Sequence, residues 1–328
     1  MPTARIIGTG SYLPEMVVKN TDFEKMMDTS DEWISTRTGI RERHFSQGME
    51  NWEMGLHAAR RALEAAGTEP GELALIVGTT ITPDYYYPGL SNLVQAKLGA
   101  SNAFCFDVAA ACNGFVTALD IVWQFLRSGR VGKALIVSSE QLSKTLDFSD
   151  RSTCVLFGDG AGAAVLAPDE RGIRNVANFS EADFEGVLAC PALPPKSPFL
   201  NEDARTLFAE LAPGRLHMGG RETYKFATRA LPGAIRAVLE GTGVGLDELR
   251  YIVPHQANLR IIQTAAEHLG VSMDKMVVDI DKYGNTSSAT MPIALDELAR
   301  AGKLSPGDKI VFAGFGGGFN YGAALLEW

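Results

Sequence analysis

Two similar stretches of sequence limit how this chain can fold more than any other feature does. Residues 63–77 (LEAAGTEPGELALIV) align without gaps on residues 239–253 (LEGTGVGLDELRYIV), and seven of the fifteen positions are identical. Each stretch has the pattern of a helix end, a turn and an apolar strand. This repeat, whose offset carries residue 63 onto residue 239, therefore predicts two related α/β halves that bury a core against each other.

Short apolar runs alternate with helical stretches along the rest of the chain. The runs typical of buried strands are residues 73–80, 133–139 and 309–315, and the helical stretches are residues 52–67 and 294–302. With 328 residues, the chain is longer than one simple core needs. We expect an α/β fold whose halves are residues 1–172 and 173–328. Residues 184–214 are rich in proline and predict a surface excursion that covers a cleft.

Composition excludes several classes of protein. A net charge of −9 argues against non-specific nucleic-acid binding, and no apolar run reaches the length of a membrane span. The four cysteines form no C-x-x-C pair, so neither a zinc site nor a redox motif is expected. The N-terminus has the pattern of a strand and turn instead of a signal peptide, which favours a cytoplasmic protein with reduced thiols.

One cysteine stands where a strand is predicted to turn into a helix. Cys112 lies in DVAAACNGF (107–115), between small residues. The unpaired N–H groups and the dipole at a helix N-terminus favour the thiolate, which is the nucleophilic form. From this segment alone, a small buried hydrophobic role for Cys112 remains the alternative.

Three further features are candidates for work with that thiol. His255 follows the predicted strand of the second repeat, at the end where active sites of α/β sheets lie. Asn285 lies among small residues before a predicted helix, and a glycine run at residues 314–322 can bring N–H groups to a developing oxyanion. Cys112 and Asn285 each lie seventeen residues before a glycine that ends a helix, so we expect them at matching places in the two halves.

Two glycine motifs have a competing interpretation as dinucleotide-binding loops. GTGS (8–11) lacks the third glycine and runs into Pro14, so it cannot open a Rossmann helix. GDGAG (158–162) leads into an apolar run with strand character instead of a helix. We therefore expect no nucleotide cofactor.

Long motifs in a fixed order resemble the β-ketoacyl-acyl-carrier-protein synthase III family of thiolase-like condensing enzymes. The resemblance spans nearly the whole chain, and the matching stretches are IIGTGSYLP, TSDEWISTRTGIRER, DVAAACNGF, RSTCVLFGDGAGAAVL, VPHQANLRII, YGNTS and FGGGF. It implies a duplicated fold layered α-β-α-β-α. It also implies transfer of an acyl group from acyl-coenzyme A to a cysteine and condensation with malonyl-acyl-carrier protein, releasing CO₂. Acyl-coenzyme A would be a substrate, and neither a cofactor nor a metal is implied.

The resemblance assigns roles to residues one at a time. It implies Cys112, His255 and Asn285 as the catalytic triad, the N–H groups of Cys112 and Gly317 as the oxyanion hole, and Phe315 as the residue that keeps the site dry. The residues implied at the rim are Thr29, Trp33, Arg37, Arg151 and Asn258 for coenzyme A, Tyr87, Leu156 and Phe157 for the acyl pocket, and Lys225 and Arg260 for carrier-protein docking. Tyr87 corresponds to a residue that crosses a homodimer interface.

Some positions depart from the family pattern without touching the triad. They are Asn113 after the cysteine, the aromatic run Tyr85–Tyr87, Arg221, and the length of the 184–214 excursion. Each can alter which acyl group fits. A relative that serves a specialised pathway is the alternative function, and an inactive carrier-binding subunit would have lost the nucleophile.

Overall fold

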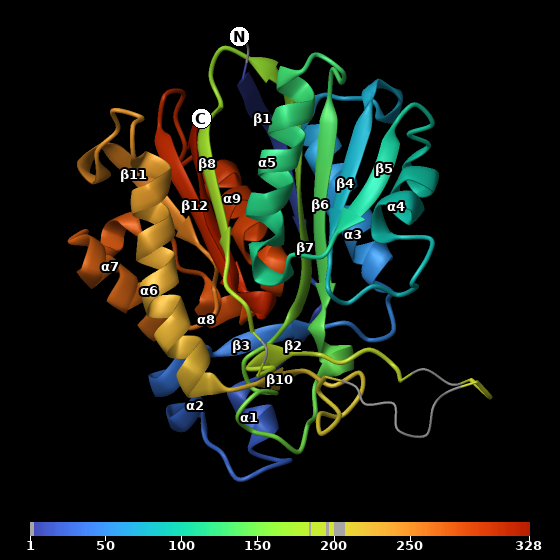
Figure 1. Cartoon of the computed structure of the whole chain (residues 1–328), viewed down its shortest axis with the longest axis vertical. Helices are drawn as coiled ribbons and strands as arrows, with labels where there is room; N and C mark the ends of the chain where they lie inside the picture. The colour runs from blue at the N-terminus through green and yellow to red at the C-terminus, as the bar shows by residue number, and fades with distance from the viewer. Residues whose placement is uncertain (1–2, 184, 195–196, 200–206) are drawn as a thin grey trace.

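The core of the protein is built on two β-sheets, which lie side by side with helices between them in Figure 1. The computed structural model describes residues 3–183, 185–194, 197–199 and 207–328. The first sheet has the order β1-β7-β6-β4-β5, formed by β1 (Thr3–Tyr12), β7 (Asp159–Asp169), β6 (Ala134–Gln141), β4 (Leu75–Thr79) and β5 (Phe104–Val108). Because β4 is parallel to both β5 and β6, the carboxyl ends of these three strands meet at one edge.

The second sheet repeats most of the first. Its order is β11-β12-β13-β8, formed by β11 (Leu249–Pro254), β12 (Lys309–Gly316), β13 (Asn320–Glu327) and β8 (Ile173–Ser180). These strands correspond in order and direction to β4, β6, β7 and β1. The counterpart of β5 is reduced to an isolated bridge between Ile252 and Met276. The chain passes from the first sheet to the second between Asp169 and Ile173.

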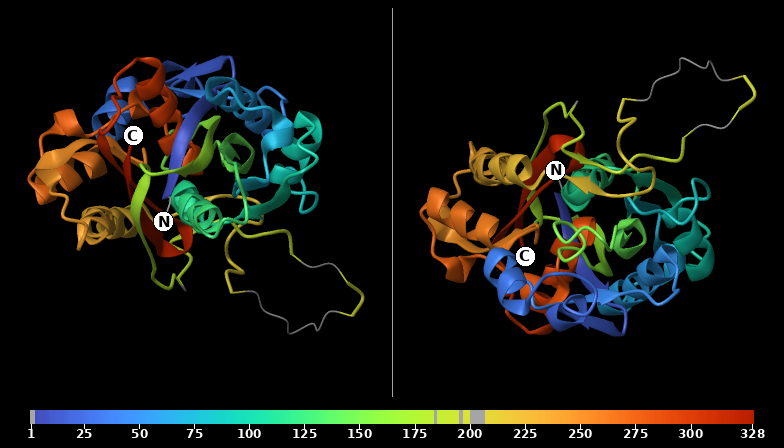
Figure 2. Two further views of the ribbon diagram at one scale, coloured as in Figure 1. Left: turned by 90° about the horizontal axis from the view of Figure 1, so that it is seen from above. Right: turned by 90° about the horizontal axis from the view of Figure 1, so that it is seen from below.

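Helices form three layers around the two sheets (Figures 1 and 2). α5 (Gly114–Arg127) and α9 (Thr290–Arg300) lie between the sheets and contact strands of both, and α5 is accordingly apolar around most of its circumference. α3 (Asn51–Ala66) and α4 (Leu90–Leu98) cover the outer face of the first sheet. α6 (Gly220–Leu239) and α7 (Leu259–Leu269) cover the outer face of the second. The predicted α-β-α-β-α fold is confirmed.

Smaller elements cap the end of the molecule drawn at the bottom of Figure 1. They are β2 (Met16–Lys19), α1 (Asn20–Phe23), α2 (Asp31–Thr38), β3 (Glu42–Phe45) and α8 (Ile280–Tyr283). β9 (Leu188–Ala189) pairs with β10 (His217–Met218) at the base of the predicted excursion. Residues 184, 195–196 and 200–206 of that excursion lie outside the described residues. Within the described part of the chain, no helix combines the length and apolarity that a bilayer crossing requires.

The two repeated stretches have the same secondary structure, and an ion pair in one recurs in the other. α3 and α6 are each followed by a 3₁₀ turn and then a strand, and the turns are Pro70–Glu72 and Leu246–Glu248. Glu72 pairs with Lys133 at 2.6 Å, and Glu248 pairs with Lys309 in the same way. Both members of the pair recur at the offset of the repeat, so the duplication is confirmed at the level of side chains.

The predicted match between Cys112 and Asn285 is wrong. α5 begins at Gly114 and α9 begins at Thr290, and the offset of the repeat carries the first of these residues onto the second. The residue in the place of Cys112 is therefore Ser288. The expectation counted back from the glycine after each helix, Gly129 and Gly302. Because α9 has 11 residues and α5 has 14, this count misaligned the two turns by three positions.

Candidate active site

A cavity of about 780 Å³ lies where the strands of both sheets end against the cap. Its lining includes Cys112 from the first half and His255, Asn285, Phe315 and Gly317 from the second. The structure therefore brings all five residues predicted for the chemistry to one cavity. Neither half has the complete set, which explains why the site requires the duplicated fold.

Cys112 lies in the 3₁₀ turn Ala111–Asn113, two residues before α5 begins. Ala111 has a left-handed backbone with φ of 48°, which is rare for alanine and typical of residues held in place at functional sites. Burial raises the pKa of the Cys112 thiol to about 12. The thiolate that the helix N-terminus was expected to favour is therefore disfavoured by burial in the free enzyme.

His255 directly follows β11, and its backbone N–H donates to Ala313 O at 2.8 Å. Its Nδ1 lies 2.9 Å from Thr290 Oγ1, and that hydroxyl donates to Ser287 O at 3.0 Å. With the hydroxyl proton used in this way, Nδ1–H donates to Thr290 and Nε2 keeps its lone pair. Burial lowers the pKa of His255 to about 3, so the imidazole is neutral and Nε2 can accept a proton.

Asn285 is held by backbone pairing with the first half. It forms an isolated parallel bridge with Phe157, in which Asn285 N donates to Leu156 O at 2.9 Å and Gly158 N donates to Asn285 O at 3.0 Å. Its Oδ1 accepts a hydrogen bond from Ser287 N at 2.8 Å. Because the carbonyl end is occupied, the Nδ2 donors remain for a ligand. Leu156 and Phe157 also line the cavity, as predicted for the acyl pocket.

The end of β12 forms the wall opposite Cys112. A Cβ atom at Gly316 would lie 2.5 Å from Cys112 N, so only glycine lets the two backbones approach this closely. Phe315 meets the His255 ring edge to face, with 5.2 Å between ring centroids. Gly317 lines the cavity, and its carbonyl accepts from Asn320 Nδ2 at 3.2 Å. The oxyanion role of its N–H stays a prediction.

Three of the residues predicted for coenzyme A line the cavity, namely Trp33, Arg37 and Asn258. The guanidinium groups of Arg37 and Arg151 lie 4.9 Å and 5.2 Å from the Trp33 ring centroid. Arg151 also donates to Asp28. The family resemblance implies that the adenine of coenzyme A lies between Trp33 and Arg151. Since Arg151 itself occupies the face of Trp33, such an arrangement requires Arg151 to move. Asn258 caps α7 by accepting from Arg260 N.

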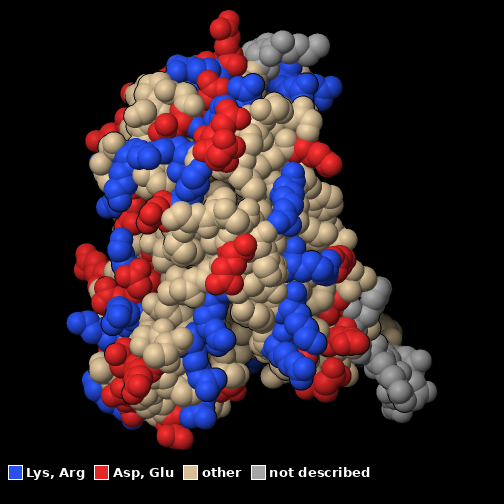
Figure 3. Space-filling view, turned by 90° about the vertical axis from the view of Figure 1, so that its left-hand side faces the viewer, with Lys and Arg blue, Asp and Glu red and all other residues tan. Residues whose placement is uncertain are grey.

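Besides Arg151, four predicted residues do not line the cavity of this chain, namely Thr29, Tyr87, Lys225 and Arg260. Tyr87 is 88% exposed, and Thr29 has a buried hydroxyl without a hydrogen-bond partner among the described residues. Lys225 on α6 and Arg260 on α7 are exposed, each next to a residue that lines the cavity. Figure 3 views this face and shows Lys and Arg side chains on both sides of a hollow in its lower part.

Sequence reasoning missed the polar residues behind the triad. Ser287, Ser288, Thr290 and Glu140 are all buried and surround the three catalytic side chains. The offset of the repeat, applied to Cys112 itself, would have pointed to Ser288. Among the described residues, no group of His, Cys, Asp and Glu side chains is arranged to hold a metal ion.

Comparison with known proteins decides the family. Family profiles described as 3-oxoacyl-[acyl-carrier-protein] synthase III and its C-terminal part match residues 106–182 and 239–328. The β-ketoacyl-[acyl-carrier-protein] synthase III of Clostridium acetobutylicum is 47% identical over 329 aligned residues, covering 100% of this chain and 99% of that protein. The chain belongs to the β-ketoacyl-acyl-carrier-protein synthase III family. It is thus an acyltransferase of the condensing class.

Solved structures agree with this synthase III assignment. The crystal structure of 3-oxoacyl-[acyl-carrier-protein] synthase III from Aquifex aeolicus has a TM-score of 0.90 and 43% identity, covering 99% of this chain and 100% of that one. The priming β-ketosynthase of the R1128 polyketide biosynthetic pathway has a TM-score of 0.90 and 37% identity, covering 99% and 96%. The thiolase-like fold is therefore shared along the full length of the chain.

Proposed function

We propose that this synthase III condenses an acyl group from acyl-coenzyme A with malonyl-acyl-carrier protein, and so begins fatty-acid synthesis. One observation supports this above all others. A thiol, an imidazole with a free Nε2 and an amide with free Nδ2 donors line the same cavity. An acyl transfer without condensation would use the imidazole only as a base and would have no use for the amide donors, because it forms no enolate.

In the first half-reaction, the sulfur of Cys112 attacks the thioester carbon of acyl-coenzyme A. The thiol proton passes to Nε2 of His255, so that no free thiolate accumulates at a site where burial disfavours it. The N–H groups of Cys112 and Gly317 stabilise the oxyanion. The carbon–sulfur bond to coenzyme A then breaks, and its sulfur takes the proton from His255.

In the second half-reaction, malonyl-acyl-carrier protein loses CO₂, and the electrons of the broken carbon–carbon bond move onto the thioester oxygen. Asn285 Nδ2 and His255 Nε2–H donate to this enolate oxygen. The Thr290 hydroxyl serves both halves, since it can accept from Nδ1–H or donate to Nδ1. The enolate carbon attacks the acyl carbonyl on Cys112, and the released sulfur takes up a proton from solvent. Phe315 limits water at the reacting atoms.

The rim of the cavity fits two anionic substrates. Arg37 and Arg151, beside Trp33, offer cations and an aromatic face to coenzyme A, and Asn258 offers an amide to its pantetheine arm. Lys225 and Arg260 would receive the acidic carrier protein on the face shown in Figure 3.

A homodimer through β5 is part of the proposal. β5 is an edge strand, and Phe104 on it is 62% exposed, as an unprotected apolar edge would be at an interface. Tyr87, which is 88% exposed, would then reach the acyl pocket of a second copy. Sedimentation equilibrium at twice the chain mass is expected, and a monomer would rule out this role for Tyr87. We also propose a cytoplasmic location, in keeping with four cysteines that form no disulfide.

A priming ketosynthase of a specialised pathway is the second candidate function. The structural similarity to the R1128 priming enzyme favours it, because that protein shares the fold at 37% identity. The two functions differ in the acyl group accepted and the carrier protein used, and share the chemistry.

The test is to incubate the protein with a panel of acyl-coenzyme A thioesters and to measure its intact mass. We expect an acyl adduct on Cys112, and the accepted chain length separates the two candidate functions. Asn285→Ala should still form the adduct but release CO₂ from malonyl-acyl-carrier protein far more slowly. If no thioester adds mass to the wild-type protein, the two-step scheme is wrong. Equal loss of both steps in Asn285→Ala would contradict its role.

A further inference from the structure

A fully buried carboxylate, Glu140, stands behind the active-site turn at the end of β6. Its Oε1 accepts from the Ser288 hydroxyl at 2.7 Å. Its Oε2 accepts from the Thr82 hydroxyl at 2.8 Å, from Ile81 N at 3.0 Å and from the Thr80 hydroxyl at 3.2 Å. The mechanism above does not use this group.

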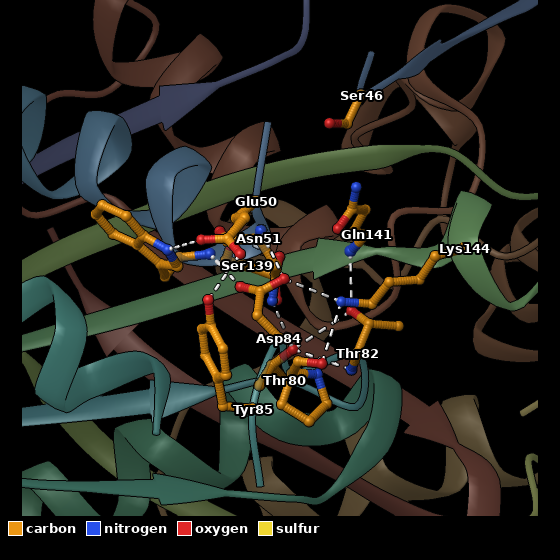
Figure 4. A network of polar contacts seen from close by, with 12 residues as sticks. Ser46, Glu50, Asn51, Thr80, Thr82, Asp84, Tyr85, Ser139, Gln141 and Lys144 are labelled. Carbon is orange, nitrogen blue, oxygen red and sulfur yellow. Dashed lines mark hydrogen bonds and ion pairs between the residues drawn. The ribbon is translucent and has the colours of Figure 1, made fainter. Parts of the chain in front are cut away.

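The hydroxyl protons around Glu140 have fixed directions. Thr82 Oγ1 already accepts from Gln141 N at 2.8 Å, and Thr80 Oγ1 accepts from Asn51 Nδ2 at 3.0 Å, as Figure 4 shows for these four residues. Each hydroxyl is therefore left to donate to Glu140. Four hydrogen bonds donated to a carboxyl group stabilise its ionised form. These donors therefore oppose the rise in the pKa of Glu140 that burial causes.

The charge of Glu140 has no cation beside it. No Lys or Arg forms a salt bridge with it in the described ranges. The Ser287 hydroxyl lies beside both the Cys112 thiol and the Glu140 carboxylate and lowers the pKa of each, although it forms no regular hydrogen bond. Cys112 and His255 line the cavity, Glu140 lies behind them, and the Glu140 charge adds to the effect of burial in raising the pKa of the thiol.

The internal repeat explains why a carboxylate stands there. At the offset that carries residue 63 onto residue 239, Ser288 takes the place of Cys112, and Thr79 takes that of His255. Glu140 takes the place of Gly316, and the strand registers agree, since Ile76 pairs with Leu135 as Ile252 pairs with Val311. Glu140 therefore faces Ser288 as Gly316 faces Cys112. The turn that carries Ser288 therefore holds the two halves together through its hydrogen bond to Glu140.

We propose that Glu140 is a positioning residue with two effects: its hydrogen bond to Ser288 fixes the segment 285–290, and its charge adds to the burial that keeps the Cys112 thiol protonated until an acyl thioester is bound. The inference rests on the proposed role of Cys112 as nucleophile. A neutral thiol resists alkylation and oxidation, whereas a thiolate in an open cavity does not.

The charge effect is tested on full-length protein without any thioester. Iodoacetamide alkylation of the peptide that carries Cys112 is followed by mass spectrometry from pH 6 upward, which separates Cys112 from the exposed Cys190. Glu140→Gln should alkylate about tenfold faster than wild type at each pH, for every unit by which its thiol becomes more acidic. A folded Glu140→Gln protein with the wild-type curve would overturn the charge effect.

Ser288→Ala is the matched control, because it removes the tie and keeps the carboxylate. Its alkylation should speed up much less than that of Glu140→Gln, because the carboxylate keeps three of its four hydrogen bonds, while its CO₂ release from malonyl-acyl-carrier protein slows. Normal CO₂ release in this variant would overturn the positioning effect. Should Glu140→Gln fail to fold, Thr82→Val takes its place in the test. This variant removes a hydrogen bond that stabilises ionised Glu140, so it must also make alkylation of Cys112 faster. Since alkylation needs no substrate, it remains measurable even if the protein accepts no acyl-coenzyme A.

Discussion

The turn that carries Cys112 and the turn that carries Ser288 have similar backbone conformations but different roles. Each has a left-handed residue first, Ala111 with φ of 48° and Ser287 with φ of 50°, and each enters a central helix two residues after its polar side chain. Duplication therefore supplied two equivalent places for a nucleophile.

What differs is the group that each turn faces. Cys112 faces the bare backbone of Gly316 and shares an open cavity with an imidazole. Ser288 faces a carboxylate and a threonine hydroxyl, and it is not among the residues that line the cavity. The comparison teaches that the backbone provides a strained turn, and that the opposite strand end decides whether the turn reacts or anchors.

The largest effect is expected from exchanging the two polar side chains. Cys112→Ser should lower condensation at least roughly a thousandfold, since removal of a nucleophile costs this much or more in acyl-transfer enzymes. Adding Ser288→Cys to that variant should not restore activity, because a thiol there lies against the Glu140 carboxylate. Intact mass after incubation with acyl-coenzyme A measures both. An acyl adduct on residue 288 would break the distinction between the turns.

The next largest effect is expected at the glycine wall. Gly316→Ala places a Cβ 2.5 Å from Cys112 N, so the backbone of the nucleophile must move. Misplacement by about 1 Å can lower the rate about a hundredfold, and we expect a loss of this size in adduct formation measured by stopped-flow quenching. Gly233→Ala in α6 is the control, because its Cβ meets open space. Wild-type rates in Gly316→Ala would mean that the close approach is not needed.

The fold and the triad could be predicted because their signals are local or carried by long motifs. The apolar runs at β4, β6 and β12 gave the strands to within two residues, since such runs are typical of strands buried on both faces. His255 was placed correctly because a polar residue directly after a buried strand lies at the edge where ligands bind.

The charge state and the anchor could not be predicted because they depend on contacts between the halves. The dipole argument at Cys112 considered only its own helix, whereas the burial that raises its pKa depends on everything packed around it, including the backbone of Gly316. Glu140 ends an apolar run in a way common for surface acids, and its partner Ser288 lies 148 residues away. The place of Asn285 was misjudged because helix lengths differ between repeats.

A smaller effect is expected at Thr290, where the first half has Gly114 in the equivalent place. Thr290→Val keeps the shape but leaves Nδ1 of His255 without its partner, so CO₂ release should fall about tenfold, which is the value of one hydrogen bond to a reacting group. Release of labelled CO₂ measures this step. Thr290→Ser should recover most of the rate. If the serine variant is as slow as valine, packing and not the hydroxyl is what matters.

The smallest effect is expected from another buried acid, Asp279, and it concerns stability instead of catalysis. Glu140 receives four hydrogen bonds, whereas Asp279 Oδ2 has no partner among the described residues, and burial raises the pKa of Asp279 to about 8. Between its ordinary pKa of 3.8 and about 8, the folded state holds a proton that the unfolded state has lost. Stability therefore falls as the pH rises through this window, by at most about 1.4 kcal/mol per unit.

Asp279→Asn removes that ionisation, so its melting temperature should exceed that of wild type by a few degrees at pH 8.5 and match it near pH 4. Calorimetry across this range measures the difference. Glu140→Gln should behave in the opposite way at pH 8.5, because it discards an anion whose hydrogen bonds are complete. If the melting temperature of Asp279→Asn exceeded that of wild type equally at every pH, the carboxyl of Asp279 would be ionised in the folded state. The contrast between Glu140, whose charge is hydrogen-bonded, and Asp279, whose Oδ2 is not, would then disappear.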